Sequence, residues 1–511
     1  MKPHATLYLP AVGMAIVFYF LFKNEWPGIN MPLFLLLSSA VLSIIHPGAF
    51  RRATVIASFA AVLLCAIAVL IFNTDISIIA YWLLFGVMVG FIHQRDLRSS
   101  GGALLTSWLG LIASPLSWWN ALEHFGKNNK PLSSLLKLLR LSILPLAVLL
   151  FFFILYVNAD QQFESVSGQV MTFLYDQIKI LFDYISPSTI TFFVFSLLIA
   201  AGIFLKRDLQ LIVKMELQQG DFLQRKRLKP TGKPGEIDWW QLFFRKSMRS
   251  LSNEYNRAIL LLLMVNGLLL FVNVVDIKMV WFENTSLASP HTRSQAVHES
   301  TYLLLFSIAV AMAILLFFFR GNLNFLKNNR RLLQLSCLWI AQNGILAFTA
   351  AIRNYYYIRD YGLAYKRIGV LFFLLLILFS LSILFLKIRD KRSFFYLFRM
   401  EGWAICILLV LMSCFSWDPM IATYNLTHFD DEHIDRNFLM TLSHRALPVI
   451  LEYDHPFENT TNTTPLTGYQ QWIIQKGKSF LQSYEATSWP SWNLQDARVY
   501  DYLKSQSQFY E

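Results

Sequence analysis

Charged residues are scarce in this chain of 511 residues. Asp, Glu, Lys and Arg make up 15% of it, whereas typical water-soluble domains contain about 25%. Apolar residues make up 55%, and near-continuous apolar runs recur, for example at 141–156, 303–319 and 368–386. A membrane-spanning helix needs about 20 mostly apolar residues. The low charge therefore argues against a water-soluble globular protein, and the runs predict a protein that crosses a membrane several times.

Cysteine is also scarce, and the chain lacks the short motifs of common enzymes. The four cysteines, Cys65, Cys337, Cys406 and Cys414, lie in apolar runs, and none forms a Cys-x-x-Cys pair. We interpret them as buried free thiols, which behave as small hydrophobic groups. A serine nucleophile elbow is absent, and Gly232-Lys233 lacks the rest of a phosphate-binding loop. No motif in the sequence establishes whether the protein is an enzyme, and none calls for a cofactor.

The positive charge is distributed between the apolar runs. The formal net charge is +12, which in another context would suggest nucleic acid. Loops between spans that are rich in Lys and Arg are instead typical of the cytoplasmic side of a membrane. The sequence thus predicts the lipid bilayer as partner and no nucleic acid. The basic segments are Arg51-Arg52, Arg95 with Arg98, 127–140, 206–257, 320–331 and 387–399.

The apolar runs predict an all-α, polytopic transmembrane bundle of about eleven spans. With the basic segments in the cytoplasm, the N-terminus is cytoplasmic and the C-terminus extracytoplasmic. The first run has no cleavage site after it, so we interpret it as a retained span. The predicted spans are 5–22, 31–46, 53–72, 76–92, 141–157, 188–205, 258–276, 299–319, 331–352, 364–386 and 400–417.

Four regions follow from this topology. Residues 1–205 form an N-terminal bundle with two interfacial segments: 102–119, which has basic flanks on both sides, and 165–185, an amphipathic helix. Whether 102–119 spans the membrane stays open. Residues 206–257 form a basic cytoplasmic loop that we expect to attract anionic lipid or a protein partner. Residues 258–417 form a second bundle.

Residues 418–511 form a small helical tail on the outside. Helices are expected at 430–447, ending before Pro448, at 468–486 and at 494–505. The histidines of the first helix suggest a metal site, but His433 and His444 would lie about 16 Å apart along it. That separation is too large to share an ion bound at about 2 Å. A mixed site of His428, Asp430 and His433 is the remaining alternative, and we predict no metal.

Polar residues inside the predicted spans form one set of candidates. Asn266 and Asn273 are seven residues apart on one helical face, with Asp276 one turn further. Gln342 and Asn343 lie in the middle of another span. Polar side chains in a membrane face the bundle interior and hydrogen-bond between helices. They are also the groups that would line the substrate cavity of a transporter.

Two acids after the predicted span 141–157 form a second set. Asp160 and Glu164 lie in the outer segment Asn158–Glu164. Membrane transferases that use lipid-linked sugars commonly place acids in an early outer loop, to hold a metal or to act as base. Helix capping is the structural alternative. We regard the two residues as weak catalytic candidates.

The outer turn 353–367 is the third candidate. It carries Arg353, Tyr357, Arg359, Tyr361 and Arg367 on the side of the membrane where basic residues are scarce. Gly362 is predicted to permit the turn into the next span. Arginine at headgroup depth binds phosphate or carboxylate through paired hydrogen bonds. The tail between 418 and 458 is rich in acids, so docking of the tail on this turn explains both charge clusters without a ligand. Docking is our first interpretation and an anionic ligand the second.

Six short segments carry a resemblance to a known family. In order and spacing they resemble a group of bacterial polytopic inner-membrane proteins known only as domains of unknown function, the types numbered four-one-seven-three and four-one-five-three. The resemblance covers residues 140–500 and implies a bacterial inner membrane, but it supplies no activity, substrate or catalytic residue. The chain departs from the family pattern at Gln161 and at Ala364, where a threonine hydroxyl is missing. The segments are 158–163, 266–276, 357–367, 421–426, 438–443 and 489–494.

Three functions are compatible with these residues. The first is a membrane scaffold or sensory partner whose outer tail docks on 353–367. The second is a membrane-embedded enzyme that acts on a lipid-linked or anionic substrate at the outer leaflet. The third is a transporter with a polar cavity at mid-membrane. The sequence favours the first and names no protein partner.

Overall fold

The chain folds into helices throughout the part that the structure, a computed structural model, describes. That part comprises residues 5–119, 186–205, 209–224, 251–279, 290–319, 322–326, 329–454, 457 and 467–506, with scattered positions between 141 and 172. No strand occurs there, and one isolated antiparallel bridge joins Phe222 to Arg392. The predicted all-α class is therefore confirmed for the described residues.

Within the described part of the chain, seven helices are long and apolar enough to cross a membrane. Helices also occupy the other predicted spans; in 141–157 the described positions are interrupted by gaps, and all of them are helical. The seven are α3 (Ala53–Phe72), α4 (Asp75–His93), α9 (Pro187–Phe204), α12 (Leu251–Ile277), α14 (Arg330–Tyr361), α15 (Tyr365–Arg389) and α16 (Phe394–Ser413). The shorter apolar segments lie in α1 (Ala5–Phe22), α2 (Asn30–Ile45), α5 (Ser100–Ile112) and α13 (Pro290–Phe318).

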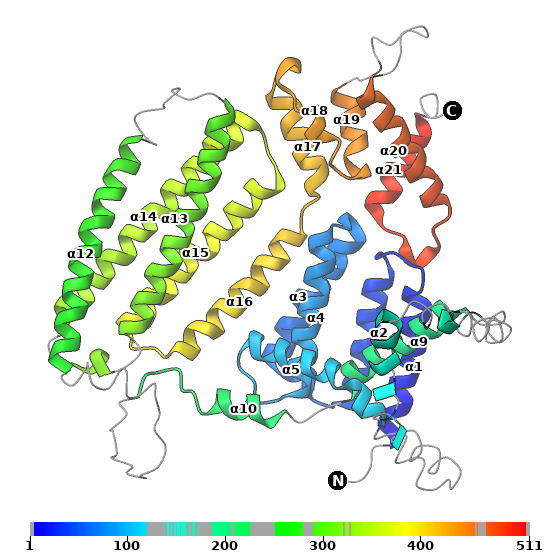
Figure 1. The fold of residues 1–511 in the computed structure, drawn as a ribbon, viewed down its shortest axis with the longest axis horizontal. Helices are drawn as coiled ribbons and strands as arrows, with labels where there is room; N and C mark the ends of the chain where they lie inside the picture. The colour runs from blue at the N-terminus through cyan, green and yellow to red at the C-terminus, as the bar shows by residue number, and fades with distance from the viewer. Residues whose placement is uncertain are drawn as a thin grey trace.

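The helices form two groups, which lie on the two sides of Figure 1. One group contains α1 to α5 and α9, and the other contains α12 to α15. Helix α16 packs on both, since Leu397 near its start belongs to the core of the second group and Cys406 to the core of the first. The predicted second bundle, 258–417, therefore includes a helix that packs on both groups.

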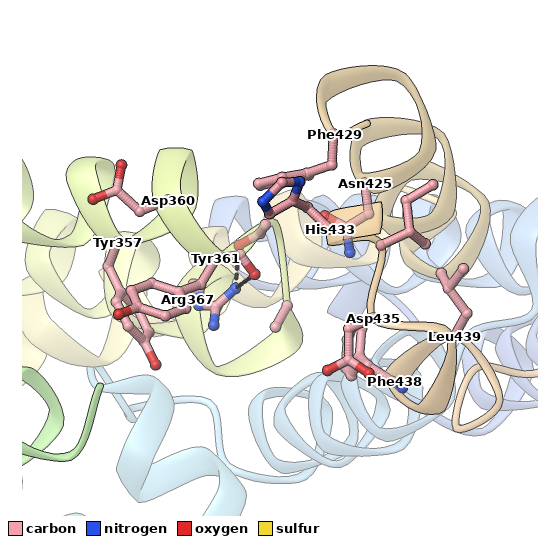
Figure 2. A pocket seen from close by; sticks show the side chains of 13 residues that line it. Tyr357, Asp360, Tyr361, Arg367, Asn425, Phe429, His433, Asp435, Phe438 and Leu439 are labelled. Atoms are coloured by element: carbon pink, nitrogen blue, oxygen red, sulfur yellow. Dashed lines mark hydrogen bonds between the residues drawn. The ribbon is translucent and has the colours of Figure 1, made fainter. Parts of the chain in front are cut away.

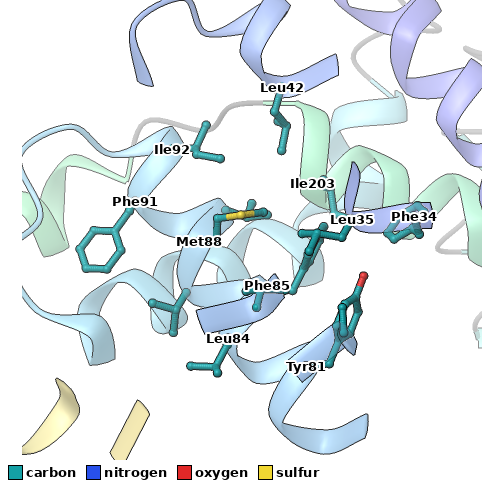
Figure 3. Packing of buried hydrophobic residues seen from close by; sticks show 14 of the residues in the cluster. Phe34, Leu35, Leu42, Tyr81, Leu84, Phe85, Met88, Phe91, Ile92 and Ile203 are labelled. Atoms are coloured by element: carbon teal, nitrogen blue, oxygen red, sulfur yellow. The ribbon is translucent and has the colours of Figure 1, made fainter. Parts of the chain in front are cut away.

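Aromatic and aliphatic side chains pack the core of the first group (Figure 3). Tyr81 of α4 is fully buried, and its hydroxyl donates to the carbonyl of Met31 at 2.9 Å. A Cβ at Gly90 would collide with the carbonyl of Ala103, so α4 and α5 touch through their backbones. The segment 102–119 is helical except at its turn at Ala113, and Trp118 Nε1 donates to Leu197 O at 2.8 Å.

A short segment packs at the end of the molecule that carries Arg98 and Arg399, which we call the basic end. We call residues 209–224, which include α10 (Gln210–Leu217), the strap. The buried carboxylate of Glu216 accepts hydrogen bonds from the backbone of Arg98 and Ser99 at 2.9 and 3.3 Å, and from the Ser99 hydroxyl. Asp221 pairs with Arg98 at 2.6 Å and with Arg399 of α16 at 3.2 Å. The strap thus ties the start of α5 to α16.

The opposite end carries the C-terminal region, residues 417–506 (Figure 1). Its longer helices are α17 (Trp417–His428), α19 (Leu447–Tyr453), α20 (Gly468–Glu485) and α21 (Leu494–Ser505). The predictions for 468–486 and 494–505 agree with α20 and α21. Short elements join them: η4 (Asp431–His433), α18 (Arg436–Leu439), η5 (His444–Ala446) and η6 (Trp489–Ser491).

The predicted helix 430–447 is wrong. The side chain of Asp435 caps α18 at Phe438 N, and that of Ser443 caps η5 at Arg445 N. Each cap begins a new short helix and interrupts the predicted one, because a capping residue has a non-helical backbone. Pro448 lies in the first turn of α19, where its missing N–H costs nothing.

Candidate functional site

The turn between α14 and α15 is the centre of the candidate site. Helix α14 continues beyond the predicted span to Tyr361, and Gly362 then takes a φ of +83°. Such a backbone angle is unfavourable for residues with a side chain. The sequence predicted that Gly362 permits this turn, and the structure confirms it.

Asn425 of α17 binds the backbone of this turn. Its Oδ1 accepts from Leu363 N at 2.6 Å, and its Nδ2 donates to Leu363 O at 3.0 Å. A Cβ on Gly362 would lie 2.5 Å from that Oδ1, so glycine is required for space as well as for φ. Asn425 is 9% exposed. The Asn425 amide therefore hydrogen-bonds to both the N–H and the C=O of Leu363 in a contact shielded from water. Removing this amide would leave both backbone groups unpaired, which costs free energy.

Apolar side chains surround the Asn425 contact. Ile358, Leu363 and Ile368 of the turn share a core with residues of the C-terminal region. That core includes Ile421, which is fully buried, and continues through the C-terminal helices. The contact between the turn and the C-terminal region is thus mainly apolar and amide-based, whereas the sequence suggested that charges would make it.

Arg353 and Arg359 of the turn are paired with acids other than those of the C-terminal region, which the sequence predicted as their partners. The carboxylate that contacts Arg353 is Asp276 of α12, which lies beside α14 within the second group. Arg359 pairs with its neighbour Asp360 at 2.9 Å. Asp418 of the C-terminal region accepts from the hydroxyls of Tyr365 and Ser443. One tail acid therefore does touch the turn region, but it binds a tyrosine.

A cavity of about 620 Å³ lies between the turn and the C-terminal region; we call it the junction cavity (Figure 2). Arg367 lies on the turn side, with its guanidinium 4.2 Å from the ring centre of Tyr357. Its Nη1 donates to the carbonyls of Tyr361, at 2.7 Å, and Gly362. The opposite wall comes from α17, η4 and α18 and includes Asn425, Phe429, His433, Asp435 and Phe438.

The intramembrane polar residues connect α12 to α14. Asn266 Nδ2 donates to Leu262 O and, across the interface, to Leu335 O at 3.1 Å. Gln342 Nε2 donates to Asn266 Oδ1 at 3.3 Å, and Asn273 Nδ2 to Gln342 O at 3.1 Å.

The remaining members of this set are Asn343 and Asp276. Asn343 Nδ2 donates within its own helix, to Trp339 O at 2.8 Å. Asp276 and Arg353 add an ion pair between α12 and α14. All five predicted intramembrane residues are buried. Apart from that of Asn343, their contacts join the two helices, which agrees with interhelical bonding, one of the two interpretations that the sequence left open.

The catalytic candidates Asp160 and Glu164 lie outside the described residues. Within the described part of the chain, no group of three or more His, Cys, Asp or Glu side chains is placed to hold a metal ion. His433 lines the junction cavity, whereas His444 lies elsewhere, and its Nε2 donates to Oδ1 of Asp496 of α21 at 3.0 Å.

Asp496 organises a second contact zone within the C-terminal region. It also accepts from Arg445 Nε at 2.8 Å and from Asn493 Nδ2 at 2.7 Å. Burial alone would raise the pKa of Asp496, but the hydrogen bonds from His444 and Arg445 hold that pKa well below its usual range. This carboxylate is ionised at neutral pH and fixes η5 against α21.

The C-terminal region also contacts the first helical group. Ile29 N donates to Trp492 O at 2.9 Å, and the carboxylate of Glu25 accepts from the Ser491 hydroxyl at 2.6 Å. A Cβ on Gly28 would lie 2.5 Å from the Ser491 carbonyl. Since Asn425 contacts the second group, the C-terminal region bridges both groups at the end opposite the strap.

Asn425 and the Ser491–Trp492 contact were not among the predicted site residues. Both lie in segments that carried the family resemblance, and that was their only signal in the sequence. A family model described as a domain of unknown function (DUF4153) matches residues 58–453. The match includes the turn and Asn425 and ends before Trp489. Neither a curated protein nor a solved structure is significantly similar to the chain.

Proposed function

The chain belongs to the DUF4153 family, and from this premise we propose that it is an integral-membrane scaffold or sensory protein. In this proposal the C-terminal region lies outside the cytoplasm, docks on the turn 353–367, and responds there to a ligand or partner. The observation that carries the proposal is the pairing of Asn425 with both backbone groups of Leu363, beside the junction cavity.

The placement of basic residues supports the proposed orientation. Arg98 and Arg399 lie at the strap end. Lys391 and Arg392 lie there too, since Leu223 N donates to Lys391 O at 2.9 Å and Arg392 forms a bridge with Phe222. The positive-inside rule makes that end cytoplasmic. We therefore propose about eleven spans in a bacterial inner membrane, with a cytoplasmic N-terminus, an extracytoplasmic C-terminus and anionic lipid as partner of the loop 206–257.

Cysteine labelling in intact cells tests the orientation. A Ser505→Cys variant and a Gln218→Cys variant are made in a background whose native cysteines are replaced by serine. We expect a membrane-impermeant maleimide to label Ser505→Cys in intact cells, and Gln218→Cys only after the cells are opened. The opposite pattern would reverse the topology and remove the proposed function.

Limited proteolysis tests the docking. Asn425→Ala removes both hydrogen bonds to Leu363, and each buried group left without a partner costs about 1–3 kcal/mol. We expect the C-terminal region of this variant to be cleaved faster in membrane preparations. Thr427→Ala on the same helix is the control, because the hydrogen bonds of the Thr427 hydroxyl stay within α17, to the carbonyls of Thr423 and Tyr424 and to the ring of His428. Equal cleavage rates for the two variants would contradict docking through Asn425.

A further inference from the structure

We propose that the junction cavity binds a small zwitterionic molecule, with its carboxylate on Arg367 and its cationic group towards Asp435. The inference rests on the proposed function only for what binding does to the C-terminal region. The binding itself follows from the hydrogen-bond donors, the charges and the lining of the cavity.

Among the described residues, Arg367 has hydrogen-bond donors without a partner. Nη1 of its guanidinium donates to the carbonyls of Tyr361 and Gly362. Within the described part of the chain, Nε and Nη2 have no acceptor, and no carboxylate lies within ion-pair distance. The two carbonyls and the Tyr357 ring hold the guanidinium in place. An arginine held this way with one edge free matches the two oxygens of a carboxylate.

The charge of the cavity decides against a strongly anionic ligand. Two acids, Asp360 and Asp435, line the cavity together with Arg367. Asp360 is compensated by Arg359 at 2.9 Å. Asp435 is exposed, its Oδ1 caps Phe438 N at 3.0 Å, and no described cation pairs with it. Among the described residues of the lining, Arg367 and Asp435 remain as unmatched opposite charges, so a phosphate dianion would meet repulsion where a zwitterion meets two opposite charges.

The lining also indicates an apolar body between the two charges. The rings of Tyr357, Tyr361, Phe429 and Phe438 line the cavity (Figure 2). A volume of about 620 Å³ lies within the range of about 300–1,000 Å³ that is usual for small-molecule sites. An amino acid with an aromatic or aliphatic side chain, or a short peptide of such residues, fits these properties.

The cavity has walls on both sides of the docking contact. Arg367 belongs to α15, whereas Asp435 lies immediately before α18 in the C-terminal region. A ligand that touches both residues binds only when the region is docked. By mass action such a ligand stabilises the docked state, which would give the proposed sensory function its signal.

Three probes with the same aromatic body test the assignment of charges. Phenylalanine carries both charges, 3-phenylpropionate only the carboxylate, and 2-phenylethylamine only the ammonium group. Each is titrated calorimetrically into the full-length protein in lipid nanodiscs. We expect phenylalanine to bind at least about ten-fold more tightly than either analogue, a difference of about 1.4 kcal/mol. Failure of phenylalanine to bind, or equal binding of 3-phenylpropionate, would overturn the proposal.

Two variants assign the ends of the ligand. Arg367→Gln removes the carboxylate partner and is expected to abolish phenylalanine binding. Asp435→Asn removes the charge but keeps the helix cap, because asparagine caps as well as aspartate; phenylalanine should then bind no better than 3-phenylpropionate. Unchanged phenylalanine binding in either variant would overturn the proposal.

Proteolysis without ligand separates this inference from the proposed function. Protease resistance of both variants in the absence of phenylalanine reports docking and folding, whereas calorimetry reports binding. Loss of binding with normal resistance supports the site and leaves docking intact. Normal phenylalanine binding in Asn425→Ala, with unchanged resistance, would remove the docking mechanism and keep the site.

Discussion

The two ends of the molecule are joined by different chemistry. At the strap end, buried or half-buried carboxylates of Glu216 and Asp221 hold two helix starts through short polar contacts. At the C-terminal end, an uncharged amide and an apolar core make the contact with the turn. The junction cavity lies at the second contact.

This difference suggests which end can respond to a ligand. A buried carboxylate that loses its donors is costly, so a contact of the Glu216 type resists opening. An apolar and amide contact with an adjoining cavity opens at lower cost, and a ligand that bridges it can shift its population. We therefore infer a fixed strap end and a responsive C-terminal end.

The strongest effect on stability is expected at the strap end. Glu216→Ala removes the acceptor of three donors, and hydrogen bonds to a charged group are worth about 1.5–3 kcal/mol each, without simple additivity. We expect a loss of about 3 kcal/mol, seen as a lower thermal midpoint of the protein in detergent. Glu216→Gln keeps an oxygen acceptor and should lose less. If Glu216→Ala matched the wild-type midpoint, the strap would not be the fixed end.

A smaller and more local effect is expected at the turn. Gly362→Ala introduces a Cβ 2.5 Å from Asn425 Oδ1 and places alanine at a φ of +83°. The backbone term alone costs about 1–2 kcal/mol. The C-terminal region should become protease-sensitive while the thermal midpoint of the spans changes little. Gly369→Ala is the matched control, because nothing lies within 4 Å of its added Cβ.

A loss of stability that occurs only in acid is expected from Asp496. Its pKa is lower in the folded protein than in the unfolded chain, so the stabilisation is present in full above the ordinary aspartate pKa of about 3.9. It is lost as the pH falls from there towards the folded pKa. Protease resistance of the C-terminal region, measured with an acid protease, should therefore decline below about pH 4.

Asp496→Asn tests the source of that decline. The variant cannot lose a charge on acidification, so its resistance should vary less with pH over the same interval. The Asn266–Gln342 contact between α12 and α14 involves only amides and should not change in acid. If protease resistance declined in acid to the same extent in wild type and in Asp496→Asn, the decline would come from other carboxylates.

The local features of this chain could be predicted, and the long-range contacts could not. Apolar periodicity located the helices, and the glycine at 362 identified the turn, because both depend on neighbouring residues. The pairing of Asn425 with Leu363 joins residues 62 apart in sequence, and no local pattern encodes it. Arg353 was assigned towards the tail because its real partner, Asp276, lies 77 residues earlier on another helix.

The broken helix at 430–447 has a related cause. Its apolar spacing fits a single helix, but Asp435 and Ser443 form side-chain caps that begin new turns. Aspartate and serine are tolerated inside helices and favoured at caps, so the sequence alone does not decide between the two. The same limit applies to Glu216, whose burial at the start of α5 depends on the fold of the whole basic end.

A double-mutant cycle between Gly362 and Asn425 tests the central claim, that the C-terminal region docks on the turn through this contact. Gly362→Ala, Asn425→Ala and the double variant are compared with wild type by the rate at which the C-terminal region is cleaved. Because each single change already disrupts the same contact, the double variant should be cleaved little faster than the more affected single variant. Strictly additive effects, within about 0.3–0.5 kcal/mol, would show that the two residues act independently and would contradict the account.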